Sequence, residues 1–70
     1  MDTLQISSAA ARVNAGMTQD EVSKQIGVSK NTIINWESGK SEPTISQARA
    51  LANLYSIPLE CIIFVPKETN

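Results

Sequence analysis

Apolar residues recur along this chain at intervals of three and four positions, which is the spacing of an amphipathic α-helix. The segment from Leu4 to Asn14 is rich in small and apolar residues, and Gly16 follows it as a C-terminal stop. A second periodic segment ends near Ile26, where Gly27 can take the positive φ of a tight turn. The pattern therefore predicts a helix in each of these two segments.

Hydroxyl and carboxyl side chains mark where the later helices begin. Thr18 and Glu21 form a T-x-x-E capping box, in which each side chain satisfies a free backbone N–H group of the first turn. This box predicts that the second helix begins at Thr18. Ser29 can cap a third helix, which is expected to end near Ser38 at Gly39.

The second half of the chain repeats this arrangement after a break at Pro43. Thr44 and Gln47 give a T-x-x-Q capping box for a fourth helix. Pro58 is compatible with the start of a short final helix that runs through about Phe64. The apolar residues of the fourth helix lie three or four positions apart, at Ile45, Ala48, Leu51, Ala52 and Tyr55.

The 70 residues, of which 41% are hydrophobic, allow one small domain with one modest core. We predict an all-α fold of five helices over residues 1–66, followed by a polar tail at residues 67–70. No run approaches the roughly 18 apolar residues of a membrane span, and the N-terminus lacks the apolar region of a signal peptide. We therefore expect a cytoplasmic protein without a membrane partner. Because the chain has one cysteine, Cys61, and no histidine, neither a zinc site nor a cofactor is expected.

The helical period separates a core side from an outer side in the segment from Thr18 to Ser38. Ile33 and Trp36 lie one turn apart on its second helix, and we expect both in the core. Two short helices joined by a tight turn are typical of a helix-turn-helix, whose second helix can lie in the DNA major groove. The outer side of that second helix carries Asn31, Ile34, Asn35 and Ser38, with Lys30 on its flank.

Two chemical features distinguish this outer side from a polar surface that simply faces water. Asn31 and Asn35 carry amides, which can form paired hydrogen bonds with adenine. Ile34 is an apolar residue on an otherwise polar side, and it could contact thymine methyl groups. A scattered surface hydrophobe or a dimer contact would explain Ile34 equally well.

The stretch TQDEVSKQIGVSKNTIINWESGKSEPTI resembles the helix-turn-helix of the phage-repressor/Cro-type family, also called the XRE family. The matching features are Thr18-Gln19, Gly27-Val28-Ser29, Thr32-Ile33, Trp36-Glu37, Gly39-Lys40, Pro43 and Leu51. The resemblance extends from about Leu4 to Ile63. It implies a five-helix, lambda-repressor-like domain that binds double-stranded DNA at palindromic operators as a homodimer.

The resemblance also assigns roles to individual positions. Gln19 and Lys40 match family residues that contact DNA phosphate, and Ser29 begins the recognition helix, where a phosphate contact is also expected. Arg12 and Glu37 match an arginine–glutamate pair that ties the first helix to the recognition helix. The predicted base contacts are Lys30, Asn31, Thr32, Ile34 and Asn35.

Structural alternatives to two of these roles stay open at this point. Gln19 could be solvated at a helix start. Arg12 and Glu37 could form a partly buried pair, or an exposed pair worth about 0–1 kcal/mol. Because Glu37 lies beside Ile33 and Trp36, we expect the buried version, in which loss of one partner would be costly.

The C-terminal segment from Cys61 to Val65 is dense in apolar residues. They exceed what one face of a short helix can bury in its own subunit. We therefore expect Ile62, Phe64 or Val65 to contribute to a homodimer contact. A dimer would also supply two recognition helices for half-sites about 34 Å apart, which is one turn of DNA.

Charge complicates a role in nucleic-acid binding. Six basic and seven acidic residues give a net charge of −1 and a pI of about 5.1. DNA-binding domains are often basic, because they neutralise phosphates. Lys24, Lys30 and Lys40 nevertheless fall in or beside the motif, which predicts a polarised surface.

Three classes of function follow from these observations. The first is a Cro- or repressor-like transcriptional regulator, of the kind encoded by phages or mobile elements. The second is an antirepressor that binds a partner repressor protein, which the acidic pI and the apolar C-terminus would suit. The third is an enzyme, but the chain shows no nucleophile–base pair, carboxylate cluster or phosphate-binding glycine loop. We therefore prefer the first class.

Overall fold

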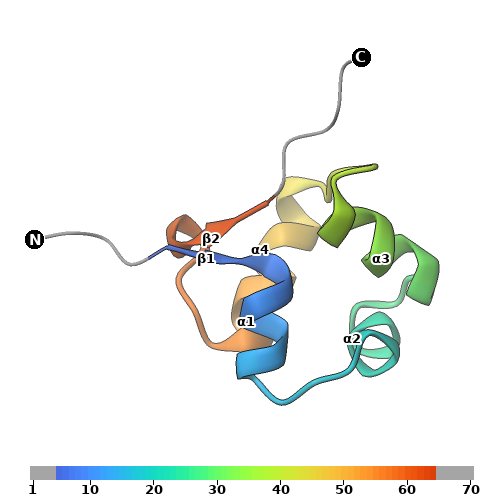
Figure 1. The fold of residues 1–70 in the computed structure, drawn as a ribbon, viewed down its shortest axis with the longest axis horizontal. Helices are drawn as coiled ribbons and strands as arrows, with labels where there is room; N and C mark the ends of the chain where they lie inside the picture. The colour runs from blue at the N-terminus through green and yellow to red at the C-terminus, as the bar shows by residue number, and fades with distance from the viewer. Residues whose placement is uncertain (1–4, 65–70) are drawn as a thin grey trace, which may run out of the picture.

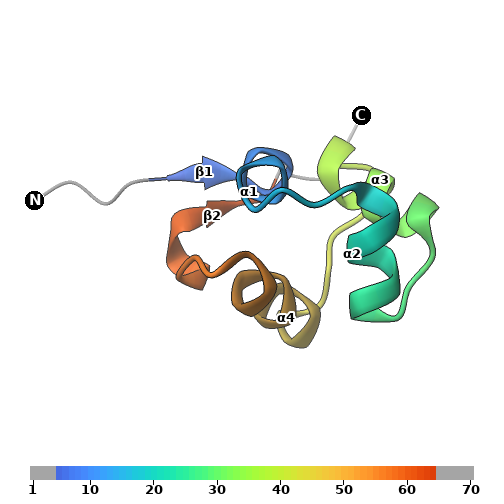
Figure 2. The ribbon, with the colours of Figure 1, turned by 90° about the horizontal axis from the view of Figure 1, so that it is seen from below.

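The computed structural model describes residues 5–64. In this part of the chain, four α-helices pack around one core, with a two-stranded sheet at one end and α2 and α3 at the other (Figures 1 and 2). Figure 2 shows α4 across the core from α1. In chain order the elements are β1 (Ile6–Ser7), α1 (Ser8–Asn14), α2 (Gln19–Ile26), α3 (Lys30–Ser38), α4 (Ile45–Tyr55), the 3₁₀ turn η1 (Leu59–Cys61) and β2 (Ile62–Ile63).

Both predicted capping boxes are confirmed. At the start of α2, the backbone N–H of Glu21 donates to Thr18 Oγ1 at 3.0 Å, and the N–H of Thr18 donates to Glu21 Oε1 at 2.8 Å. At the start of α4, Thr44 and Gln47 exchange the same two bonds at 2.8 and 3.1 Å. These bonds satisfy N–H groups that a helix leaves unpaired, so both helix starts are determined by local sequence.

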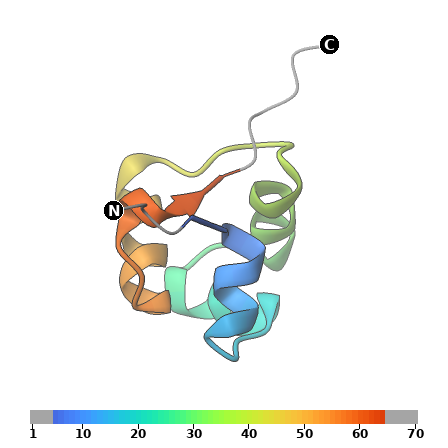
Figure 3. The same ribbon diagram turned by 60° about the vertical axis from the view of Figure 1, so that its left-hand side comes forward.

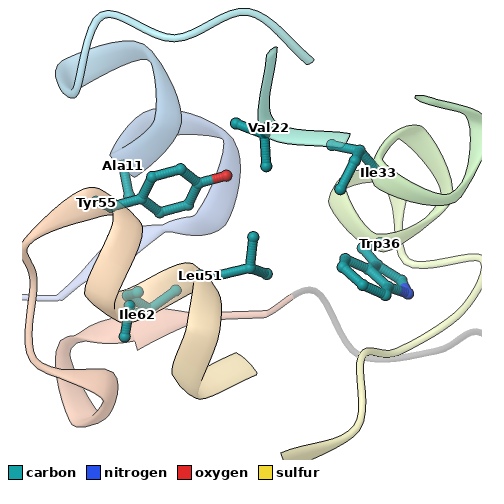
Figure 4. Packing of buried hydrophobic residues seen from close by; sticks show 8 residues of the cluster. Ala11, Val22, Ile33, Trp36, Leu51, Tyr55 and Ile62 are labelled. Atoms are coloured by element: carbon teal, nitrogen blue, oxygen red, sulfur yellow. The ribbon is translucent and has the colours of Figure 1, made fainter. Parts of the chain in front are cut away.

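The core draws side chains from all four helices and from β2. Leu51 of α4 is 1% exposed, and Figure 4 shows it between Tyr55 and Trp36. Because Trp36 and Ile33 both come from α3, that helix is anchored by the core it helps to form. The other buried members of the cluster are Ala11, Val22, Ala52 and Ile62.

The inner face of α4 agrees with the predicted apolar face at all but one position. Ala48, Leu51, Ala52 and Tyr55 are buried. Ile45 is 72% exposed. It is the first residue of α4, at a helix end that the core does not cover.

The first helix begins later than predicted. The predicted start at Leu4 lies outside the described residues, and α1 begins at Ser8. Ser7 caps the helix, because its Oγ accepts the backbone N–H of Ala10 at 3.1 Å. Ile6 and Ser7 are extended and form β1.

The predicted final helix from Pro58 through about Phe64 is wrong. In the described part of the chain, the single turn η1 follows Pro58, and β2 then pairs in parallel with β1 (Figure 3). Ile62 is 7% exposed and Ile63 is 44% exposed, which is the alternation of a strand. β-Branched side chains favour this extended backbone, so the fold has a short sheet where a fifth helix was expected.

Candidate nucleic-acid interface

The turn between α2 and α3 is fixed by backbone hydrogen bonds. Gly27 has a φ of 87°, and the N–H groups of Gly27 and Val28 both donate to the carbonyl of Ser23, at 2.8 and 3.0 Å. A Cβ atom at Gly27 would meet no heavy atom within 4 Å. Glycine is therefore required here by the left-handed backbone and not by lack of space. The turn places α3 against α2 in the helix-turn-helix arrangement that the sequence predicts.

The predicted base-contacting residues all lie on α3, four of them on or beside its outer side. Lys30, Asn31 and Ile34 are exposed, and Ile34 is 38% exposed despite its apolar side chain. Thr32 and Asn35 are half-buried. The structure thus places all five on one helix, with greater access for the first three. A helix with this outer side can present amide and apolar groups to base edges.

The first turn of α3 holds its polar groups in fixed positions. Ser29 Oγ accepts the backbone N–H of Thr32 at 3.1 Å and lies 2.9 Å from the Thr32 hydroxyl. Both hydroxyl groups are therefore engaged in the cap. The N–H groups of Lys30 and Asn31 have no partner within the helix, as at any helix start. An anion at this end would meet these N–H groups and the positive end of the helix dipole.

A polar network joins α1, α2 and α3. Arg12 Nε donates to Glu37 Oε2 at 2.7 Å, and Arg12 Nη2 donates to Glu37 Oε1 at 3.3 Å. Arg12 Nη1 donates to the carbonyl of Met17 at 2.9 Å. Gln19 Nε2 donates to Glu37 Oε1 at 3.0 Å. The arginine and glutamate side chains are 15% and 9% exposed, so the structure brings this pair together in a mostly buried site.

Tyr55 of α4 lies close enough to this network for the charges of Glu37 and Arg12 to shift its pKa. The pKa of Tyr55 is raised to about 12, mainly by burial and then by the negative charge of Glu37, while the positive charge of Arg12 acts in the opposite direction. Within residues 5–64, the Tyr55 hydroxyl is the buried side-chain polar atom that lacks a hydrogen-bond partner. Its burial therefore costs stability without contributing a bond to the network.

Two lysines beside α3 carry charge that is available to an anion. Lys30 begins α3, and Lys40 follows Gly39, whose φ of 85° ends the helix. Neither lysine forms an ion pair with another residue of the described chain. Lys24 differs, because its Nζ lies 3.2 Å from a carboxylate oxygen of Asp20. Within the described residues, a lysine without an ion-pair partner therefore lies at each end of α3.

A sequence model of the helix-turn-helix family matches residues 9–60, which include α2, α3 and α4 in full and most of α1. The chain belongs to the XRE-type helix-turn-helix family. The match confirms the resemblance that the motif between Thr18 and Ser38 indicated.

Several relatives of this helix-turn-helix protein are named as transcriptional regulators. It is 36% identical over 59 residues to the cryptic phage CTXphi transcriptional repressor RstR of Vibrio cholerae, a match that covers 84% of this chain and 52% of the repressor. It is 33% identical over 57 residues to an uncharacterized HTH-type transcriptional regulator of Archaeoglobus fulgidus, covering 81% of each protein. It is 29% identical over 49 residues to the HTH-type transcriptional activator BcrR of Enterococcus faecalis, covering 70% of this chain and 24% of the activator. The chain thus spans about half the length of the phage repressor. No solved structure matches it significantly.

The helix-turn-helix motif alone did not predict two features of the network. One is the hydrogen bond from Gln19 to Glu37, and the other is the position of Tyr55 beside them. These residues lie on three different helices and far apart in sequence. The pairing of Arg12 with Glu37 came from the family resemblance, which carries spatial information that helical periodicity lacks.

The predicted dimer contact needs a correction at Ile62. Its side chain is 7% exposed and packs in the core, because pairing of β2 with β1 turns it inward. Phe64 is half-buried and packs partly against the core, and Val65 lies outside the described residues. Ile63 is 44% exposed and is the outward-facing residue of β2. The accessible apolar surface at this end of the described chain therefore centres on Ile63 and Phe64.

Residues 5–64 contain neither a candidate membrane span nor a candidate metal site. No helix there combines the length and the apolar character needed to cross a membrane. No group of three or more His, Cys, Asp or Glu side chains there could hold a metal ion. Cys61 is a free, half-buried cysteine.

Proposed function

We propose that this protein is a sequence-specific transcriptional regulator that docks α3 in the major groove of DNA. The observation that carries this proposal is the outer side of α3, where Asn31 and Ile34 are exposed on a helix whose inner side is fixed in the core. Major-groove base edges are distinguished by amide pairing with adenine and by apolar contact with thymine. A rigid helix that presents both groups is suited to that task.

Base contacts and phosphate contacts are divided between different residues. Gln19, Ser29 and Lys40 contact phosphates and fix the position of the domain. The positive charge of Lys40, which has no ion-pair partner among the described residues and follows the end of α3, supports this arrangement. The residues that contact bases are Lys30, Asn31, Thr32, Ile34 and Asn35.

The regulator acts as a homodimer on a palindromic operator. A single α3 of nine residues reaches few base pairs, and two copies on half-sites about 34 Å apart extend the recognised sequence. The similarity to the CTXphi repressor supports a Cro- or repressor-like role encoded by a phage or a mobile element. A relative named as an activator means that the sign of regulation needs its own measurement.

A second candidate function is an antirepressor that binds a partner repressor. The net charge of −1 favours it, because a domain with no surplus of cations binds DNA weakly without specific contacts. The two candidate functions predict opposite results in one binding experiment. The regulator should bind DNA tightly and with sequence preference, and the antirepressor should bind DNA weakly and without preference.

The experiment is fluorescence anisotropy with DNA from the region that flanks the protein's own gene, at two salt concentrations. Scrambled DNA of equal length is the competitor. Tight binding that resists the competitor is the result expected for a sequence-specific regulator. Weak binding that is lost equally to scrambled DNA would contradict it and favour the antirepressor.

A further inference from the structure

The side chain of Gln19 takes part in the internal network and is also proposed to contact DNA. Its Nε2 donates to Glu37 Oε1 at 3.0 Å. Gln19 is the first residue of α2 and is half-buried, so one part of its side chain faces the protein and another part faces solvent. The same amide can therefore connect the interior of the domain to a group outside it.

Glu37 determines which way the Gln19 amide points. A carboxylate accepts hydrogen bonds and cannot donate them, so the NH₂ end of the amide must face Glu37 and the carbonyl end must face away. The amide nitrogen carries two hydrogens, and the bond to Glu37 uses one of them. The second hydrogen stays available to an acceptor outside the domain, such as a phosphate oxygen.

Arg12 makes this arrangement compatible with an approaching phosphate. A bare carboxylate beside the phosphate site would repel it. Arg12 compensates the charge of Glu37 through hydrogen bonds of 2.7 and 3.3 Å, and its third bond, to the carbonyl of Met17, ties the pair to the residue before the α2 cap. The side chains of Arg12 and Glu37 are 15% and 9% exposed, so their geometry is held by packing.

We propose that Glu37 is a positioning residue for DNA binding: it holds the Gln19 amide so that one nitrogen bridges the Glu37 carboxylate and a DNA phosphate. This inference rests on the proposed function as a DNA-binding regulator. Because Glu37 belongs to α3 and Gln19 to α2, the bridge couples the position of the phosphate anchor to that of the base-contacting helix.

The substitution Glu37→Gln tests this role with little change in shape. The new amide has one carbonyl oxygen. We expect it to accept the hydrogen bond of Arg12 Nε, which forms the shorter bond, of 2.7 Å, to the wild-type carboxylate. Its NH₂ group then faces the NH₂ group of Gln19, and Gln19 turns to present its carbonyl oxygen instead. The carbonyl oxygen of Gln19 then occupies the place of the bridging nitrogen and cannot hydrogen-bond to the phosphate there, so the bridge is lost and the displaced NH₂ group points away from residue 37.

The experiment is a double-mutant cycle on a DNA duplex selected from a random pool by the wild-type protein. We expect Gln19→Ala and Glu37→Gln each to weaken binding by about five- to ten-fold, and the double variant to bind within about two-fold of Gln19→Ala. Glu42→Gln makes the same chemical change at an exposed residue outside the network and should not alter affinity. Circular dichroism at the binding temperature checks that each variant is folded.

A second measurement identifies the phosphate itself. Neutral methylphosphonate groups are placed one at a time along the duplex. One position should weaken wild-type binding and leave Gln19→Ala unaffected, and Glu37→Gln should be insensitive at that same position. A structural role for Glu37 alone would not produce this matched loss of sensitivity.

A DNA-free measurement separates this inference from the proposed function. In ¹⁵N-resolved NMR of the free protein, the Gln19 side-chain N–H proton that donates to Glu37 should lie downfield of its position in an exposed amide, and Glu37→Gln should remove that shift. An unchanged amide signal, or additive losses of affinity in the cycle, would overturn the positioning role while DNA binding stands. Failure of the wild type to bind any duplex would overturn both proposals.

Discussion

Glu37 connects the stability of the domain to its function. Its carboxylate accepts two hydrogen bonds from Arg12 and one from Gln19, while its own helix packs into the core. Both charges lie mostly out of water, so each depends on the other for compensation. The pair therefore acts as an internal support for α3.

This support predicts unequal effects from two glutamate substitutions. Glu37→Ala leaves Arg12 buried without a counter-charge, and we expect it to lower the free energy of unfolding by about 3 kcal/mol. Glu42→Ala removes an exposed carboxylate and should change the free energy of unfolding by less than about 0.5 kcal/mol. Thermal and urea unfolding of both variants measure the difference. Small and equal changes would contradict the burial of the pair.

The raised pKa of Tyr55 predicts that the folded protein loses stability at high pH. The pKa of Tyr55 is raised from 10.0 to about 12 in the folded protein, so folding favours the neutral phenol. This contribution is complete below pH 10 and is lost as the pH rises toward 12, by about 2 to 3 kcal/mol. Tyr55→Phe removes the titrating group, and the difference in unfolding free energy between the two proteins isolates it from lysine titration. Parallel pH profiles would refute the raised pKa.

The same variant also removes a buried hydroxyl that has no partner. Tyr55→Phe should therefore be as stable as the wild type at pH 7, or more stable by up to about 1 kcal/mol. A clear loss of stability at pH 7 would show that the hydroxyl has a partner, such as a bound water.

At the scale of elements, the starts of α2 and α4 follow from local sequence. The boxes Thr18–Glu21 and Thr44–Gln47 predicted where α2 and α4 begin, and Gly27 and Gly39 predicted where α2 and α3 end. Each signal acts over three or four residues, so neighbouring sequence suffices to recognise it.

The short sheet could not be predicted in this way. Its strands come from opposite ends of the described chain, where Ile6 pairs with Ile62. An alternation of buried and exposed positions that covers only two residues cannot be distinguished from one face of a helix. Tertiary pairing therefore replaced the expected fifth helix and moved Ile62 from the predicted dimer contact into the core.

The same argument applies to the candidate site. Helical periodicity identified which residues of α3 face outward, since that depends on one element. The bond from Gln19 to Glu37 depends on how α2 crosses α3, which periodicity does not encode.

The cap of α2 supports the start of the helix-turn-helix. Thr18→Ala removes the bond from the Glu21 N–H to Thr18 Oγ1 and should destabilise the domain by about 1 kcal/mol. Ser46→Ala is the matched control, because Ser46 is exposed in the first turn of α4. Thermal unfolding compares the two variants. An equal melting temperature for both would show that the box contributes nothing to stability.

At the scale of the whole molecule, dimerisation is proposed to depend on the outer surface of β2. Ile63→Asp should shift the protein toward monomer in sedimentation equilibrium without lowering its melting temperature, because Ile63 is 44% exposed. Ile45→Asp is the control, since Ile45 is 72% exposed at the start of α4, on a different element. A wild-type protein that is monomeric both with and without DNA would contradict the dimer.

The central claim is that α3 reads bases while residues at its ends anchor phosphates, and one affinity profile tests it most directly. The measurement is binding of Asn31→Ala and Lys40→Ala to a selected operator and to its single-base variants over a range of salt, with the exposed Asn53→Ala as control. Asn31→Ala should cost about 1–3 kcal/mol on the selected operator and relax discrimination at one base pair. Lys40→Ala should weaken binding to every sequence and reduce the salt slope by about 1 per subunit. Equal losses for both variants on every sequence would contradict the assignment of base contacts to α3.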